Sequence, residues 1–120
     1  MIGVDIVEID RIKELVADEE FLNRVYTKAE IAYCRQAKSK TVISARLSTR
    51  FAAKEAVFKA IEPLKVLRWK EIEVINEESG KPVLHFHGDT KTLVDELGLK
   101  VDISLSHSDA YAVAAAILTP

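Results

Sequence analysis

Alternating apolar and polar positions predict strands at both ends of the chain. Over residues 2–7 one side of the pattern is apolar throughout, and the opposite side carries Asp5 in the middle of the segment. The same period of two recurs over residues 101–106, and residues 111–118 form a mostly apolar run. Because successive side chains of a strand point to opposite faces, this spacing predicts one strand at the start of the chain and a strand pair near its end.

A second pattern, with apolar residues every three or four positions, predicts helices. The longest covers residues 41–61, and Pro63 ends it because proline lacks the amide hydrogen and its predecessor avoids helical angles. Thr27 and Glu30 have the spacing of a capping box, which predicts a helix from there to residue 36. The other predicted helices are shorter: residues 10–17, residues 21–26 after the acidic stretch 18–20, and a segment that Asp89 caps and Gly98 ends.

Residues 71–76 and 82–87 flank a loop that contains Gly80, which predicts a hairpin. The order of elements is then strand, helices, hairpin, helix, hairpin. This order is typical of an α+β fold with a mostly antiparallel sheet, helices packed on one face and one long central helix. No linker divides the chain, so residues 1–120 are predicted to form a single domain.

Composition narrows the class of protein. Of the 120 residues, 48% are apolar and 30% charged, which predicts a folded, soluble chain. The net charge of -2 argues against bulk nucleic-acid binding, and no apolar run approaches the roughly 20 residues of a membrane span. Cys34 is the only cysteine and no signal-peptide pattern opens the chain, so no disulfide is expected and a reducing cytoplasm fits best.

Glu55 occupies a position where the long helix calls for an apolar residue. Same-face steps of three or four along this helix run through Leu47, Phe51, Glu55 and Phe58. A buried carboxylate needs a partner, which a metal ion, a cationic side chain or a bound substrate can supply. We therefore take Glu55 as the first candidate for a functional residue.

Asp5 is the second acidic candidate. Taken alone, it could cap a helix or pair with an arginine such as Arg11, which is the commoner outcome for an isolated Asp. Taken with Glu55, it completes the smallest protein contribution to a magnesium site, because that ion keeps several waters and takes other oxygens from substrate phosphates.

A basic stripe accompanies these acids, since Arg46, Arg50 and Lys54 follow one another at steps of four on the long helix. Like charges in that register repel, so an anion between them would be stabilising. The alternative is that the long side chains simply extend into solvent. Lys59 lies four residues after Glu55, a spacing that is commonly just an intrahelical ion pair.

The histidines, serines and the cysteine carry weaker signals. His107 shares the parity of the apolar face of its strand, so it is expected to be at least partly buried, either as a core residue or in a site. No Gly-x-Ser-x-Gly motif exists, which argues against a hydrolase triad. His85 and His87 face the same way but lack a third metal ligand, and Cys34 is interpreted as a small apolar filler.

Three segments together carry a family resemblance. They are Gly-Val-Asp-Ile-Val-Glu-Ile at residues 3–9, Arg-Phe-Ala-Ala-Lys-Glu-Ala at residues 50–56 with Lys59, and Ser-Leu-Ser-His-Ser at residues 104–108. In order and spacing the chain resembles the small bacterial holo-[acyl-carrier-protein] synthases, which are 4′-phosphopantetheinyl transferases. The resemblance spans nearly the whole chain.

The resemblance implies transfer of phosphopantetheine from coenzyme A to a serine of apo acyl carrier protein, in fatty acid biosynthesis, with Mg²⁺ as cofactor. By the same resemblance, Asp5 and Glu55 would ligate the metal, and Glu55 would also help to deprotonate the serine. Lys59 would neutralise the pyrophosphate or assist its departure. The residues implied to contact coenzyme A phosphates are Arg50, Lys54 and His107.

Two departures from the family pattern affect substrate contacts. Residues 61–66 lack the glycine that the family usually has near the coenzyme phosphates. Residues 18–20 are acidic where the family tends to carry basic residues that meet an acidic carrier-protein helix. Docking of the carrier would then depend on the remaining basic residues of this region, which are Arg11, Lys13 and Arg24.

The resemblance further implies a homotrimer with active sites at subunit interfaces, pairing Asp5 and Glu55 of one chain with His107 of the partner subunit. The apolar strand at residues 111–118 agrees with a sheet that another subunit covers. The competing hypothesis is a non-catalytic module that binds coenzyme A or an acyl carrier, which would not need both carboxylates. A structural oligomer would explain the apolar strand but not Glu55.

Overall fold

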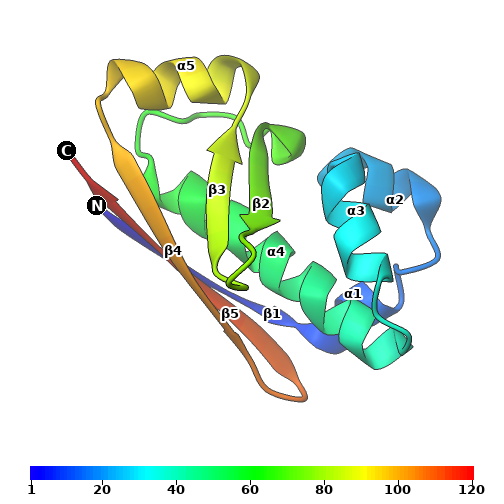
Figure 1. The fold of residues 1–120 in the computed structure, drawn as a ribbon. Coiled ribbons are helices and arrows are strands. Elements are labelled where there is room, and N and C mark those ends of the chain that lie inside the picture. Colours follow the sequence, from blue (N-terminus) through cyan, green and yellow to red (C-terminus); the bar gives the residue numbers. More distant parts are fainter.

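Two antiparallel sheets and five α-helices make up the computed structural model, which describes residues 1–120 (Figure 1). The strands are β1 (Ile2–Glu8), β2 (Ile72–Asn76), β3 (Pro82–Phe86), β4 (Lys100–His107) and β5 (Tyr111–Thr119). The helices are α1 (Ile9–Lys13), α2 (Glu19–Val25), α3 (Lys28–Arg35), α4 (Lys40–Ala60) and α5 (Gly88–Glu96), with a short 3₁₀ turn η1 at Trp69–Glu71. The predicted α+β class with a long central helix is confirmed.

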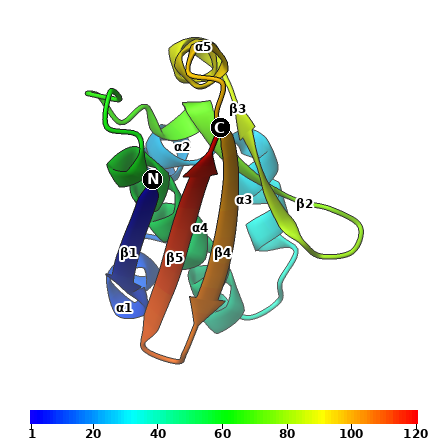
Figure 2. The same ribbon diagram turned by 90° about the vertical axis from the view of Figure 1, so that its left-hand side faces the viewer.

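The larger sheet has the strand order β1-β5-β4, and α4 packs across one of its faces (Figures 1 and 2). Small residues allow the close approach, since Ala112, Ala114 and Ala116 of β5 are all fully buried. Gly3 of β1 lies against the α4 backbone, where a Cβ would lie 1.9 Å from the carbonyl oxygen of Ala56. The opposite face of this sheet carries no helix (Figure 2).

The burial pattern of α4 differs from the predicted stripe. The helix begins after Ser39, whose hydroxyl oxygen accepts a hydrogen bond from the amide of Val42 at 3.1 Å. Leu47 of the predicted stripe is buried, and the fully buried apolar positions after it are small or branched: Ala52, Ala53, Ala56 and Val57. Phe51, Glu55 and Phe58 are only half-buried. Glu55 therefore lies at the edge of the core, because the close helix–sheet contact excludes larger side chains from its centre.

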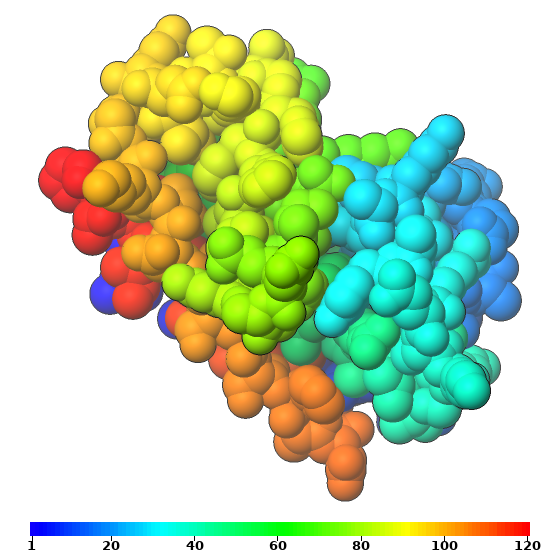
Figure 3. All heavy atoms as spheres, viewed as in Figure 1, coloured from blue at the N-terminus to red at the C-terminus, as the bar shows by residue number.

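The smaller sheet is the β2–β3 hairpin, whose turn contains Gly80 at a φ of 90°. In the space-filling view the hairpin and α3 lie side by side over α4 (Figure 3), and both elements contact that helix. They form a second layer on the side of α4 that faces away from the larger sheet. The predicted hairpin is confirmed.

Two helix starts differ from the predictions. Asp18 caps α2 by accepting the amide of Phe21 at 3.0 Å, so this helix begins at Glu19, within the acidic stretch. Acidic side chains stabilise the first turn of a helix, which explains the earlier start. Asp89 was predicted to cap α5, but it lies inside the first turn of that helix.

A glutamate from outside the helix caps α5 in place of Asp89. The Glu71 carboxylate accepts hydrogen bonds from the Thr90 amide at 3.0 Å and from the Thr90 hydroxyl at 2.8 Å. These bonds lower the pKa of Glu71, with the backbone bond from Thr90 as the main cause.

Helix α1 is also shorter than predicted, ending at Lys13. None of the helices is long and apolar enough to cross a membrane.

Candidate active site

Asp5 and Glu55 lie together at the contact between β1 and α4. Asp5 points toward the helix, and its side chain is only 8% exposed. Its Oδ1 accepts a hydrogen bond from Lys59 Nζ at 2.8 Å, whereas its buried Oδ2 has no partner. A buried carboxylate oxygen without a donor is costly, so this atom is a position where a cation or a proton would be stabilised.

The charge state of Glu55 reflects its neighbour. Burial is the main cause of a raised pKa for Glu55, and the negative charge of Asp5 raises that pKa further. Lys59 and Arg11 act in the opposite direction but do not cancel the rise. Two carboxyl groups in contact repel when both are ionised, so they share a proton or a cation most favourably.

Lys59 joins the acidic pair from one turn further along α4. Its ammonium donates to Asp5 Oδ1 and, at 3.3 Å, to the carbonyl oxygen of Val4. The hydrogen bond to Asp5 is the main cause of a raised pKa for Lys59, so the ammonium stays protonated. The side chain is 54% exposed, and one of its three hydrogens remains free for an anionic ligand.

The carboxyl pair lines a cavity of about 200 Å³ with apolar walls. Arg11 of α1 is exposed and also lines it. The other lining residues are Ile6, Val7, Ile12, Leu15, Phe21 and Phe51. Of the basic residues predicted for docking, only Arg11 borders this cavity.

The other two docking candidates, Lys13 and Arg24, lie outside the cavity that the carboxyl pair lines. Lys13 borders a separate shallow depression with Asp10 and Glu14. Arg24 is exposed, with its guanidinium carbon 5.9 Å from the centre of the Phe21 ring. The three cations therefore do not share one cavity.

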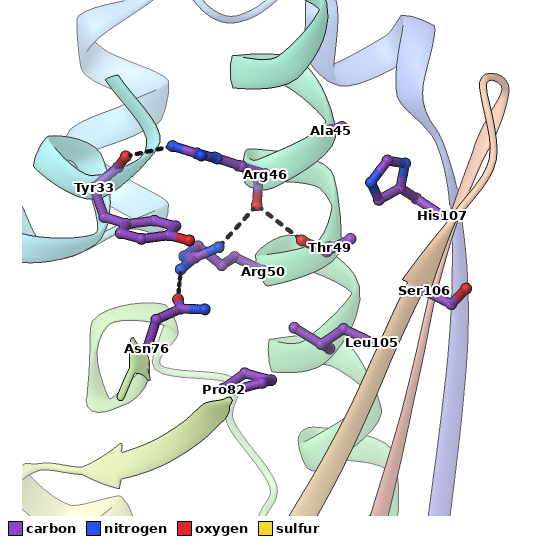
Figure 4. Close-up of a pocket in the computed structure, with 10 residues that line it drawn as sticks. All are labelled: Tyr33, Ala45, Arg46, Thr49, Arg50, Asn76, Pro82, Leu105, Ser106 and His107. Carbon is purple, nitrogen blue, oxygen red and sulfur yellow. Dashed lines mark hydrogen bonds between the residues drawn. The ribbon is translucent and has the colours of Figure 1, made fainter. Parts of the chain in front are cut away.

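A second cavity, of about 220 Å³, lies between α3, α4, the hairpin and β4 (Figure 4). It is cationic and no acidic residue lines it. Its lining residues are Tyr33, Ala45, Arg46, Thr49, Arg50, Asn76, Pro82, Leu105, Ser106 and His107. An anionic ligand is the natural occupant of such a cavity.

Arg50 is the most deeply placed cation of the second cavity, at 3% exposure. It forms no ion pair; one of its terminal nitrogens donates to Asn76 Oδ1, and the other reaches the Arg46 carbonyl oxygen at 3.4 Å. Its buried Nε has no partner. An uncompensated buried guanidinium is unfavourable, so a bound anion would stabilise it.

His107 was expected to be partly buried, but the structure places it on the surface. It is the last residue of β4, and it borders two cavities together with Ala45 of α4. The small side chain of Ala45 leaves the ring uncovered. Its Nδ1 lies 3.2 Å from the Ser108 carbonyl oxygen, which leaves Nε2 free to meet a ligand.

Lys54 does not belong to either cavity, contrary to the expectation that it contacts coenzyme A. It is fully buried and forms an ion pair with Glu30 at 2.8 Å. Its other hydrogens go to the carbonyl oxygens of Trp69 at 2.8 Å and Ile72 at 2.6 Å. All three ammonium hydrogens are engaged, so none is left for a phosphate.

His87 and Cys34 have structural environments. His87 Nε2 lies 2.9 Å from Glu73, which also accepts a hydrogen bond from Thr27. No group of three or more His, Cys, Asp or Glu is arranged to hold a metal ion. Cys34 is fully buried, and burial raises the pKa of its thiol to about 11, which agrees with its prediction as a filler.

The two cavities share no lining residue. Asp5 is on β1 and His107 is on β4, which are the two edge strands of the larger sheet. A single chain therefore separates the Asp5–Glu55 pair from the Arg50–His107 cavity. The sequence did not assign Tyr33 or Asn76 to the site, because neither belongs to a charge pattern and both lie on elements other than α4.

Comparisons with known proteins identify the family of this chain. Residues 1–116 match the family model of the 4′-phosphopantetheinyl transferase superfamily. The chain therefore belongs to this superfamily. Among its relatives, the holo-[acyl-carrier-protein] synthases of Koribacter versatilis and Halothermothrix orenii are 42% and 43% identical to it. The alignments cover 97% and 94% of this chain, and 94% and 91% of the relatives.

Solved structures extend the likeness to coenzyme complexes. A complex of the Chronobacterium ammoniagenes synthase with coenzyme A has a TM-score of 0.84 and 27% identity, over 99% of this chain and 96% of that chain. The Bacillus anthracis holo-(acyl-carrier-protein) synthase in complex with CoA (3′,5′-ADP) has a TM-score of 0.78 and 32% identity, over 98% and 93%. Both similarities cover nearly the full length of the fold.

Proposed function

We propose that this chain transfers the 4′-phosphopantetheine group from coenzyme A to a serine hydroxyl of apo acyl carrier protein, in fatty acid biosynthesis in the cytoplasm. The products are the holo carrier protein and adenosine 3′,5′-bisphosphate. The observation that supports this best is the unpartnered Asp5 Oδ2 beside Glu55, with the Lys59 ammonium on the other oxygen of Asp5.

Mg²⁺ is the cofactor of the proposal, and Asp5 and Glu55 would hold it. The donor set suits this ion, because two carboxylates leave its other positions to water and to phosphate oxygens. When bound, the ion supplies charge compensation for the diphosphate of coenzyme A. The buried Oδ2 of Asp5 is the atom that would gain most from it.

Glu55 would act as the general base, and Lys59 would stabilise the negative charge of the leaving group. A carboxylate with a raised pKa accepts a proton more readily, so Glu55 would take the hydrogen of the incoming serine hydroxyl. The free hydrogen of Lys59 would be donated to the departing phosphate. Arg50 and His107 would bind coenzyme A phosphates, with Arg46 replacing Lys54 in that role.

A homotrimer with shared active sites completes the proposal. The helix-free face of the larger sheet exposes large apolar side chains: Ile2 at 69%, Val4 at 55%, Ile6 at 62%, Tyr111 at 46% and Ile117 at 49%. A contiguous apolar patch of this kind is typical of a subunit interface. Association would also explain why Asp5 and His107 are far apart in one chain. A sedimentation experiment that finds only monomer at micromolar concentration would contradict the trimer.

Carrier docking would use Arg11 first, because it borders the carboxyl cavity, with Lys13 and Arg24 further out. A basic surface steers an acidic partner toward the site. The alternative, a non-catalytic module that binds coenzyme A or an acyl carrier, does not account for the contact between Asp5 and Glu55.

The test is the intact mass of an apo acyl carrier protein after incubation with this chain, coenzyme A and Mg²⁺. Transfer adds about 340 Da to the serine through a phosphodiester bond. We expect this addition with the wild-type chain and its loss with Glu55→Gln. Coenzyme A binding without any mass increase on several carrier proteins would favour the binding module.

A further inference from the structure

Two arginines of the second cavity converge on one aromatic ring. The guanidinium carbon of Arg50 lies 4.5 Å from the centre of the Tyr33 ring, and that of Arg46 lies 4.8 Å from it. Arg46 also donates a hydrogen bond to the Tyr33 carbonyl oxygen at 3.1 Å. Tyr33 comes from α3 and both arginines come from α4, so the ring reaches them from a different element (Figure 4).

The ring orients the arginines without neutralising them. An aromatic face attracts a cation through its quadrupole and carries no net charge. Neither Arg46 nor Arg50 belongs to any ion pair of the structure. A carboxylate in place of Tyr33 would also hold the two cations, but it would compete with an incoming phosphate.

Asn76 contributes a second neutral anchor from the hairpin. Its Oδ1 accepts a hydrogen bond from Arg50, and its Nδ2 donates to the Gly80 carbonyl oxygen at 3.1 Å. The turn of the hairpin thus fixes the amide, and the amide fixes the guanidinium. Nε of Arg50 is buried and lacks a partner, so the anchored guanidinium is not fully compensated within the chain.

We propose that Tyr33 and Asn76 are positioning residues that hold Arg46 and Arg50 as a paired cationic site for a phosphate group of coenzyme A. The inference rests on the proposed function and deepens it. Without the ring, the guanidinium groups of Arg46 and Arg50, four residues apart on α4, would repel each other and turn toward solvent. Tyr33 and Asn76 do not touch the reacting atoms, so they act on coenzyme affinity and not on the chemical step.

The first test compares Tyr33→Leu with the matched Tyr33→Phe, which keeps the ring. We expect Tyr33→Leu to raise the KM for coenzyme A about tenfold, as loss of two cation–π contacts implies, with kcat and the carrier-protein KM unchanged. Calorimetry should show the Kd of adenosine 3′,5′-bisphosphate rising by a similar factor. Tyr33→Phe should keep wild-type values in both measurements.

The second test uses Asn76→Asp, which retains an acceptor for Arg50 but adds a negative charge. We expect weaker binding of adenosine 3′,5′-bisphosphate although the melting temperature stays equal or rises. A merely structural role for Asn76 predicts unchanged affinity in this variant, and that result would overturn its part of the inference.

Failure of this inference can be distinguished from failure of the proposed function. If the wild-type chain transfers phosphopantetheine but Tyr33→Leu leaves the coenzyme A KM unchanged, only the positioning inference is wrong. If the wild-type chain transfers nothing, the binding measurements on the same variants still decide the inference. A wild-type chain that binds no adenosine 3′,5′-bisphosphate would overturn it.

Discussion

Gly3 of β1 lies so close to Ala56 of α4 that a Cβ at residue 3 would overlap the Ala56 carbonyl oxygen, at 1.9 Å. Two residues along β1 from Gly3 is Asp5, and one residue before Ala56 is Glu55. The glycine contact therefore sets the separation of the strand and the helix where the two carboxylates meet.

Gly3→Ala should consequently lower both stability and activity. Forcing a methyl group into this contact shifts β1 away from α4 at a cost of about 1–3 kcal/mol. The same shift separates Asp5 from Glu55, and misplacement of catalytic groups by about 1 Å can reduce turnover about a hundredfold. Urea unfolding and the rate of carrier-protein modification measure the two effects.

Gly98→Ala is the matched control for this prediction. Gly98 has a φ of 63°, which strains an alanine, but no atom lies within 4 Å of its added Cβ. We expect a loss of stability with normal turnover. Equal losses of turnover in both variants would show that the Gly3 contact has no special part in the site.

Removal of the Lys54 ammonium should be the most destabilising single change in the core. Lys54→Met leaves the Glu30 carboxylate buried without its cation, and breaking such a pair costs about 3–5 kcal/mol. The Lys54→Met, Glu30→Gln double variant should lose less stability than the sum of the single variants, because no lone charge remains. Chemical unfolding that places Lys54→Met within about 1 kcal/mol of wild type would contradict this.

Glu55 should make the metal-free protein less stable as the pH rises. Burial and then Asp5 raise the pKa of Glu55 above its usual 4.5, so the folded state holds its proton more tightly than the unfolded state does. The resulting stability is fully present below pH 4.5 and is lost as the pH rises through the raised value. Glu55→Gln removes this pH-dependent contribution to the stability of the fold.

The measurement is the melting temperature of both proteins across this pH range in metal-free buffer. The advantage of Glu55→Gln over wild type should grow from pH 4 toward pH 7, in the direction that proton linkage requires. A difference in melting temperature that stays constant with pH would mean that the pKa of Glu55 is not raised in the folded state. Added Mg²⁺ should raise the melting temperature of wild type more than that of the variant.

Arg11→Ala should raise the carrier-protein KM several-fold more than it lowers turnover, because an exposed charge at the edge of a site acts mainly on encounter with an acidic partner. Lys91→Ala on α5 is a suitable control, since Lys91 is exposed and paired only with Asp95. An unchanged carrier-protein KM in Arg11→Ala would refute the docking role.

The elements of the fold were predictable where local chemistry defines them. The capping box of Thr27 and Glu30 forms as predicted, with both of its hydrogen bonds present. The hairpin around Gly80 also forms as predicted. The alternation along β1 did not show which side faces the helix, because Asp5 is buried against α4 while the uniformly apolar side of the strand is exposed. The start of α5 was not predictable, because its cap comes from Glu71, which is distant in the sequence from Thr90.

The candidate site shows the same limit. The spacing of Arg46, Arg50 and Lys54 suggested one stripe of similar cations, yet two face a cavity and the third is fully buried. The difference arises from what packs against each side chain. Tyr33 meets the two arginines, whereas Glu30 and two backbone carbonyls surround Lys54.

Residue order and local periodicity were enough to predict the α+β class, the long helix, the two acidic candidates and the family resemblance. The three-dimensional structure was needed to show that Asp5 Oδ2 lacks a partner, that His107 is exposed and that Lys54 is unavailable to a ligand. Burial and pairing depend on contacts between distant segments, and long-range packing rather than local spacing determines those contacts.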